Sequence, residues 1–475
     1  MSPAAQRLRE AIEAFWRGRG QVELSWLRHG TIEAPRRSAA AFLFSDEGQE
    51  ALQSSELVSE LPPAERSALA EQRALIAAEL QGLQARPLLQ RLQSAELSVG
   101  SQTLSTPQLV AAMLRGESEP TRQLEARSLS DSLDAACSAL LDAKSRSDDA
   151  FLAQLPKPPE LSPLRELAAR VLSATDDAAQ DLTRRAARSL AASGELSWPT
   201  LLAALRRPEL DALASPKRRA FRLAEGLRRL GFERDLNQRM RAETAPGLLF
   251  PVVRLSVLSV PDDVRVALPV LDYGVTSELC VSESIGRALA AILISPVLPA
   301  ELRWPLPSCA GAALGSTYAQ LRADPLYLRR SEGLSPREAE ALARHGALVL
   351  LLRVRSEAAL LLSAAAPARN DAERLDHLVS NLRRALGVQL APGLAALLWL
   401  GTGPLTQDLA ARMCGLGVHV GLRERFDVDW FHNPRASEPL RGACTRGNGL
   451  SVEAFCKELD VSMDDGCKRL LELLA

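Results

Sequence analysis

The sequence predicts a mostly α-helical protein with one small β-sheet in the second half of the chain. Apolar residues recur at helical spacing through most of the sequence, as they do on the buried face of an amphipathic helix. β-Branched residues and prolines gather in residues 247–270, which is typical of short strands and turns. The sequence contains no repeat of about 20–50 residues, so a solenoid is disfavoured.

The first half is predicted as a series of helices. Apolar residues fall on one helical face in residues 8–16, and the proline pair at 62–63 marks the start of a second helix. The Thr-Pro pair at the start of residues 106–114 suits the cap and first position of a third helix. A further helix is predicted over residues 121–155, and the prolines that follow it end that helix.

Three regions follow from these boundaries. Helices rich in Ala, Leu and Arg are predicted after the proline-rich break at residues 156–159. Helical periodicity returns after the β-branched stretch at residues 247–270. We predict an N-terminal helical region (1–155), a second helical region (156–245) and a C-terminal region (246–475) that contains the sheet (248–271) and a helix (277–294).

The composition indicates a globular protein and argues against several classes of function. The chain has 475 residues, of which 47% are hydrophobic, enough for two or three domains or one large two-lobed fold. Its 57 Lys and Arg residues are balanced by 58 Asp and Glu residues, whereas nucleic-acid-binding proteins usually carry excess positive charge. The longest apolar run, residues 346–352, is far shorter than the roughly 20 residues that span a membrane. We therefore expect neither a nucleic-acid nor a membrane partner.

The cysteines and the first residues indicate a reducing, cytoplasmic setting. The seven cysteines are scattered and contain no Cys-x-x-Cys motif, which predicts neither a disulfide framework nor a zinc ribbon. The first 20 residues become charged and amphipathic at once and lack the core of a signal peptide. We expect a cytoplasmic protein, and its oligomeric state stays open.

Short motifs in the second half resemble one known family. They are DVRVAL (263–268), a helix with Gly286 and Ala288-Leu289, LRADPLYL (321–328), LRERF (422–426) and DWF (429–431). In this order and spacing they resemble the zinc oligopeptidases, the family that includes thimet oligopeptidase and oligopeptidase F. The resemblance covers residues 221–475. It implies a mostly α, bilobal, zincin-like fold, in which two helical lobes flank a deep cleft and a small sheet lies beside the motif helix.

The zinc ligands implied by the family are missing from this sequence. The family's helix carries His-Glu-x-Gly-His-Ala-Leu, in which two imidazoles one turn apart bind zinc and the Glu is the general base. In the best alignment, Glu283 stands at the first His, Ser284 at the base and Arg287 at the second His. Ala312 stands at the third ligand, a Glu in the family, and Asp408 stands at the late Tyr. Shifting the alignment by one residue restores no imidazole.

Loss of the metal removes most of the mechanism that the family uses. Zinc lowers the pKa of its bound water from about 15.7 to about 7, which corresponds to about 12 kcal/mol. We therefore predict no cofactor and a catalytically inactive, metallopeptidase-like protein (a pseudopeptidase) that serves as a peptide-binding or protein-interaction scaffold. Its expected partner is a peptide or a protein. The alternatives are an active metallo-oligopeptidase with a non-standard metal site, or a purely structural subunit of a larger assembly.

Two interpretations of Glu283 and Arg287 stay open at this point. Their i, i+4 spacing favours an ion pair that fills the vacated metal site. Alternatively, Arg287 receives a carboxylate of a bound peptide, for which guanidinium geometry is suited. If a cleft still serves recognition, Arg287 and Asp408 should converge across it. Cys280, three residues before Glu283, is expected to be a buried structural cysteine.

Overall fold

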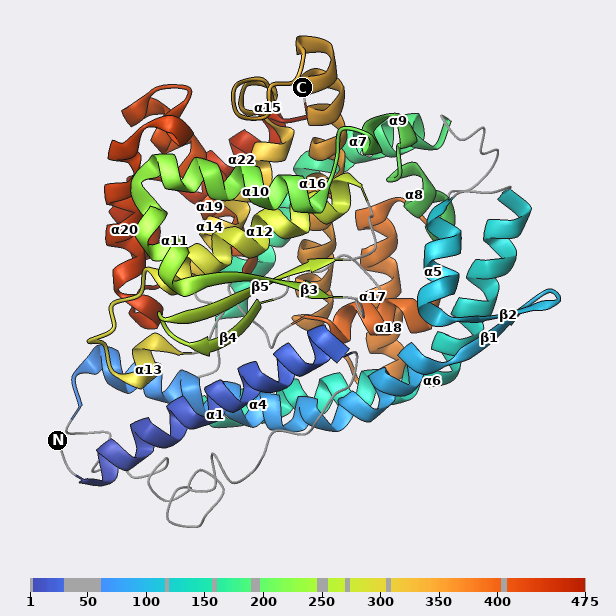
Figure 1. The fold of residues 1–475 in the computed structure, drawn as a ribbon. Helices are drawn as coiled ribbons and strands as arrows, with labels where there is room; N and C mark the ends of the chain where they lie inside the picture. Colours follow the sequence, from blue (N-terminus) through green and yellow to red (C-terminus); the bar gives the residue numbers. More distant parts are fainter. Residues whose placement is uncertain are drawn as a thin grey trace.

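The structure is a computed structural model, and helices make up most of it (Figure 1). It describes residues 3–29, 61–115, 119–155, 160–188, 197–245, 255–269, 274–304, 309–402 and 408–474.

The N-terminal helices agree with the sequence prediction, but a hairpin between them was missed. The elements are α1 (Pro3–His29), α4 (Pro63–Ser94), β1 (Glu96–Val99), β2 (Gln102–Ser105), α5 (Thr106–Arg115), α6 (Glu119–Gln154) and α7 (Leu161–Arg188). The strands β1 and β2 pair in an antiparallel hairpin of four residues each. Strands this short and this polar carry too little hydrophobic alternation to predict. The predicted break at residues 156–159 lies outside the described residues.

The predicted sheet exists, but one of its strands, residues 240–245, lies before the predicted sheet and in the region predicted to be helical. The elements before and within it are α8 (Trp198–Ala204), α9 (Pro208–Asp211), α10 (Pro216–Leu227), α11 (Glu233–Arg239), β3 (Met240–Ala245), β4 (Leu255–Ser259) and β5 (Asp263–Pro269). The strand order is β3-β5-β4, with β3 parallel and β4 antiparallel to β5. The β3 sequence, MRAETA, has no β-branched pattern, and its pairing with the buried β5 decides its conformation. Residues 248–254 and 270–271 of the predicted sheet lie outside the described residues.

The second half consists of packed helices, several of which lie above the sheet in the view of Figure 1. The motif helix α12 (Val275–Ile292) is almost wholly buried and begins two residues before the predicted start. The helices after it are α13 (Ala300–Arg303), α14 (Cys309–Ala319), α15 (Pro325–Glu332), α16 (Pro336–Ala364), α17 (Asp371–Leu386), α18 (Pro392–Leu400), α19 (Asp408–Phe426), α20 (Ser437–Thr445), α21 (Val452–Leu459) and α22 (Met463–Glu472).

Glycines allow α12, α14 and α19 to approach closely. A Cβ atom at Gly286 on α12 would lie 2.3 Å from the carbonyl oxygen of Leu314 on α14. A Cβ atom at Gly415 on α19 would lie 2.0 Å from the carbonyl oxygen of Ala313. Only glycine fits such backbone contacts. The three helices therefore form one tight layer, and polar side chains from α12 and α19 meet within it.

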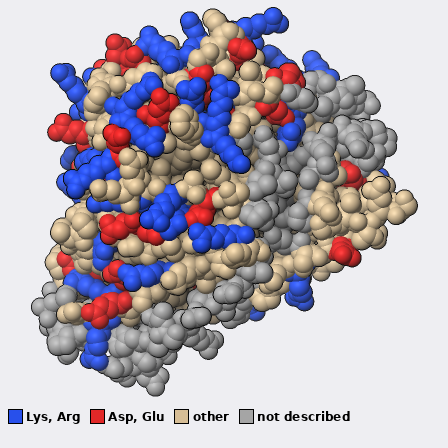
Figure 2. All heavy atoms as spheres, viewed as in Figure 1, with Lys and Arg blue, Asp and Glu red and all other residues tan. Residues whose placement is uncertain are grey.

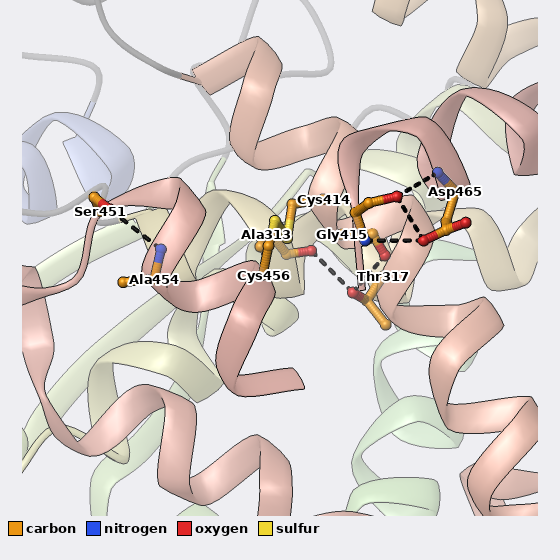
Figure 3. The surroundings of a disulfide bond; sticks show 9 residues. Ala313, Thr317, Cys414, Gly415, Ser451, Ala454, Cys456 and Asp465 are labelled. Atoms are coloured by element: carbon orange, nitrogen blue, oxygen red, sulfur yellow. Dashed lines mark hydrogen bonds between the residues drawn. A yellow bond between two sulfur atoms is a disulfide. The ribbon is translucent and has the colours of Figure 1, made fainter. Parts of the chain in front are cut away.

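A disulfide joins α19 to α21, although the scattered cysteines predicted no disulfide framework. Cys414 and Cys456 are bonded, and their Cα atoms are 6.1 Å apart (Figure 3). Forty-two residues separate the two cysteines, so only the fold brings them together. The spacing of cysteines does not encode their connectivity, so the pair could not be predicted from the sequence.

The surface carries charges of both signs. Figure 2 shows basic and acidic side chains interspersed over the helical part of one face. This mixture agrees with the formal net charge of −1. Within the described residues, no helix combines the length and the hydropathy required to cross a bilayer.

Candidate functional site

Glu283 lies at the centre of a buried cluster that also contains arginines from three helices. Its carboxylate is fully buried in the middle of α12. Arg412 of α19 donates to both oxygens of Glu283, from Nη2 to Oε1 at 3.0 Å and from Nη1 to Oε2 at 3.1 Å. The same guanidinium donates to both oxygens of Glu357 on α16, at 2.5 and 2.6 Å. Arg412 therefore bridges two carboxylates and is itself buried.

Two further arginines complete the shell around Glu283. Nη2 of Arg287, one turn along α12, is 3.0 Å from Oε1 of Glu283. Nη2 of Arg353 on α16 is 3.0 Å from Oε2, and its Nη1 is 3.2 Å from the sulfur of Cys280. The predicted ion pair between Glu283 and Arg287 is confirmed, and so is the burial of Cys280. We call Glu283, Arg287, Arg353, Glu357 and Arg412 the arginine–glutamate cluster.

The electrostatics of the cluster fix the charge of Glu283. Burial by itself would raise the pKa of this carboxyl group, but Arg353, Arg412 and Arg287 outweigh burial and hold the pKa far below its usual range. Burial lowers the pKa of Arg412, and the carboxylates of Glu283 and Glu357 raise it well above its ordinary value. Glu283 is therefore a permanent anion that serves as the acceptor for three cations.

The cluster carries more positive than negative charge. Three guanidinium groups face two carboxylates, which leaves an excess of one positive charge. Arg412 is buried, whereas the side chains of Arg287 and Arg353 are 11% and 25% exposed. The excess charge therefore lies at the solvent side of the cluster.

A second buried network on α12 is electrically neutral. Arg219 of α10 pairs with Glu332, and Arg322 pairs with both Glu332 and Glu278, so two cations face two carboxylates. Ser282 of α12 accepts a hydrogen bond from Nε of Arg219 at 2.9 Å. All five residues are buried. This network joins α10, α12 and α15 and has the balanced charge expected of a structural role.

Two of the predicted site positions, Ser284 and Ala312, are buried, one on α12 and one on α14. Ser284 is buried, and its hydroxyl donates to the backbone oxygen of Cys280 at 2.8 Å. Ala312 is buried on α14, one turn before Gly315, where an added Cβ would meet both Glu283 and Arg287. The position predicted for a third ligand thus lies on the helix that packs against the cluster.

Asp408 lies one helical turn before Arg412 at the start of α19. Asp408 acts electrostatically on Cys309 of α14. Burial of that thiol, together with the charges of Glu453 and Asp408, raises its pKa to about 12. Within the described residues, no hydrogen bond or ion pair joins Asp408 to the arginine–glutamate cluster. The predicted convergence of Asp408 with Arg287 across a cleft stays a prediction.

Sequence reasoning missed Arg353, Glu357 and Arg412. They lie 70 or more residues beyond Glu283, and no local spacing connects them to it. One signal was available, because Arg353 directly follows the apolar run 346–352 on a helix that is otherwise largely buried. A charged residue in such a position requires a partner.

The cluster does not fit a zinc ion. Zinc requires deprotonated thiolate, neutral imidazole or carboxylate donors, and guanidinium nitrogens are protonated and offer no lone pair. All the polar contacts that Glu283 makes through its carboxylate go to arginines. In the part of the chain that the structure describes, no group of three His, Cys, Asp or Glu residues is placed to hold a metal.

Comparisons with known proteins show the fold. Neither a protein-family model nor a curated protein sequence matches the chain. PZ peptidase A with an inhibitor aligns with a TM-score of 0.60 at 11% identity, over 99% of this chain and 85% of that one. The chain shares the fold of that protein. A Pyrococcus furiosus carboxypeptidase aligns with a TM-score of 0.53 at 11% identity, over 100% of this chain and 99% of that one. A protein described as an oligoendopeptidase F aligns with a TM-score of 0.56 at 12% identity, over 98% of this chain and 84% of that one.

The comparison confirms the predicted fold class. The aligned chains match nearly the full length of this protein, including the N-terminal half in which the sequence showed only helical character. At 11–12% identity the likeness concerns the fold, and the chemistry of the site depends on this chain's own residues.

Proposed function

We propose that this protein is a catalytically inactive member of the peptidase fold, a pseudopeptidase that binds a peptide or a protein segment without cleaving it. The observation that carries the proposal is the saturation of Glu283 by three guanidinium groups. The sequence resemblance aligns Glu283 and Arg287 with the two zinc-binding imidazoles. A metal-activated water has no place beside these cations.

The chemistry of the cluster supports the absence of hydrolysis. Without zinc, the pKa of an attacking water stays far above the value of about 7 that the metal gives it, a difference of about 12 kcal/mol. Glu283 is a poor general base, because its pKa is held far below the usual range and both oxygens accept hydrogen bonds from arginines. Ser284 is a poor nucleophile, since its buried hydroxyl donates to the backbone of its own helix.

Two features support retained recognition over a purely structural role. The fold is shared along nearly the whole chain with proteins that are named as peptidases. The cluster is not sealed by large apolar side chains, since Arg287 and Arg353 keep part of their surface. Convergent polar groups that stay partly accessible are typical of ligand sites. The cytoplasmic setting expected from the sequence is part of this proposal.

A peptide-retention experiment tests the proposal. The protein is incubated with a pool of random nonapeptides, once with added zinc and once with a chelator, and the bound and free peptides are identified by mass spectrometry. We expect enrichment of intact peptides on the protein and no cleavage products in either condition. Zinc-dependent cleavage would contradict the proposal, and so would the absence of any retained peptide.

A further inference from the structure

The excess charge of the arginine–glutamate cluster has no counter-ion among the described residues. Arg287 and Arg353 form no ion pair there with any carboxylate other than Glu283, which they share with Arg412. Glu357, the second carboxylate of the cluster, accepts two hydrogen bonds from Arg412. Charges in a largely buried site are normally balanced by a partner. Since the neighbouring network of Arg219, Arg322, Glu278 and Glu332 is balanced, the imbalance is a feature of this site.

The unbalanced groups have spare hydrogen-bonding capacity. A guanidinium has five N–H donors in a planar fork. Arg287 directs Nε and Nη2 to one oxygen of Glu283, at 3.1 and 3.0 Å. Arg353 directs Nη2 to the other oxygen at 3.0 Å and Nη1 to the sulfur of Cys280. Both arginines thus have donors left for another acceptor, and both are partly exposed.

Ion pairs hold the side chains of the cluster in place, which favours binding. Glu283 holds Arg287 from the same helix and Arg353 from α16, so that neither side chain must be ordered when a ligand binds. A Cβ atom at Gly315 of α14 would lie 2.7 Å from Cγ of Glu283 and 3.1 Å from Cγ of Arg287, so α14 packs closely against both side chains. The site is therefore a preorganised pair of cations with one net positive charge.

We propose that Arg287 and Arg353 form a binding site for a carboxylate group, supplied by the free C-terminus or by an acidic side chain of a peptide. Carboxylates match the guanidinium fork in shape, and they form charge-assisted hydrogen bonds that are about twice as strong as neutral ones. This inference rests on the proposed function and names the ligand chemistry of the same site. Recognition by charge would thus take the place of catalysis by metal.

The test compares peptide pools and variants by fluorescence anisotropy. Three fluorescein-labelled nonapeptide pools are used: free C-terminus, amidated C-terminus, and amidated without Asp or Glu. We expect the first pool to bind and the third to bind at least about tenfold more weakly, the change expected for loss of one charge-assisted hydrogen bond. A preference for the first pool over the second identifies the C-terminus as the source of the carboxylate, and equal binding identifies acidic side chains.

Matched variants keep the test specific to the cluster. Arg353→Gln should weaken binding of the free-acid pool by about tenfold or more. Arg344→Gln removes an arginine of the same helix that is 79% exposed, and it should leave binding unchanged. Glu357→Gln should tighten binding, because it removes a negative charge from the cluster. Circular dichroism confirms that each variant is folded.

The outcomes separate this inference from the proposed function. Equal binding of all three pools, unaffected by Arg353→Gln, would overturn the carboxylate site and leave peptide binding intact. If no peptide binds, but sodium acetate raises the Tm of the wild type and not of Arg353→Gln, the carboxylate site stands and the peptide-binding function fails. Absence of both effects would overturn both proposals.

Discussion

Glu283 and Arg412 lie 129 residues apart in the sequence and form two parallel hydrogen bonds in the interior of the protein. The bonds join the middle of α12 to α19 at the position where the zinc oligopeptidase resemblance places a metal ligand. Breaking a buried pair by removing one partner leaves an uncompensated charge, which is costly. The site therefore takes part in holding the fold together.

Substitution of Glu283 should destabilise the protein strongly. Glu283→Gln leaves Arg287, Arg353 and Arg412 without their shared counter-ion, and we expect a loss of about 3–5 kcal/mol in the free energy of unfolding. Urea denaturation measures this loss. The control, Glu340→Gln, removes a carboxylate of α16 that is 60% exposed and should change stability by less than about 0.5 kcal/mol. Similar losses in both variants would contradict a special role for Glu283.

Substitution by alanine should have opposite effects at two glycines, one inside the tight helix layer and one on α10. Gly286→Ala places a Cβ atom 2.3 Å from the backbone oxygen of Leu314, so the helices must separate, at a cost of about 1–3 kcal/mol. Gly226→Ala on α10 meets no atom within 4 Å and should stabilise the protein by about 0.5–1 kcal/mol. Thermal unfolding of both variants provides the comparison. A Gly286→Ala protein as stable as the wild type would show that α12 and α14 are farther apart than described.

His419 should make the stability fall as the pH drops below neutrality. Burial lowers the pKa of His419 from 6.5 to about 4, although Asp324, 3.4 Å away, opposes the shift. Between these pH values the unfolded chain binds a proton that the folded protein does not, so stability is present above pH 6.5 and is lost as the pH falls to 4. One such group contributes a slope of up to about 1.36 kcal/mol per pH unit.

Urea denaturation between pH 7.5 and 4.5 measures this slope. In His419→Gln the slope should become smaller, while Trp430, whose indole donates to His419 at 3.3 Å, keeps an acceptor. The control, His29→Gln, changes an exposed residue at the end of α1 and should keep the wild-type slope. An unchanged slope in His419→Gln would show that His419 has the same pKa in the folded and the unfolded protein.

Restoring the zinc donors tests why the site excludes metal. Glu283→His, Arg287→His and Ala312→Glu rebuild the donor set that the resemblance implies, and Ser284→Glu restores the general base. Arg353 and Arg412 would still repel a dication at short range. Adding Arg353→Gln and Arg412→Gln should therefore raise the zinc affinity of the four-residue variant by at least about tenfold. Isothermal titration calorimetry measures both affinities, and equal values would show that these arginines do not control metal binding.

The fold could be predicted from the sequence further than the site could. Helical periodicity and proline positions located α1, α4, α5 and α6, and the order of motifs gave the fold class that the comparisons confirm. β3 was missed because its conformation is decided by pairing with β5, a tertiary effect.

Of the cluster, local spacing could predict one ion pair. Glu283 and Arg287 are four residues apart, and their pairing follows from helix geometry. Arg353 and Arg412 reach Glu283 only because α16 and α19 pack beside α12. The same holds for the disulfide between Cys414 and Cys456, since packing of α19 against α21 brings the two sulfurs together.

The metal content of the purified protein tests the central claim most directly. Protein expressed in ordinary medium and dialysed without chelator is analysed for zinc by inductively coupled plasma mass spectrometry. Because three guanidinium groups surround Glu283, we expect far less than one zinc ion per chain. One zinc ion per chain, removed by a chelator and restored together with peptide cleavage, would contradict the account.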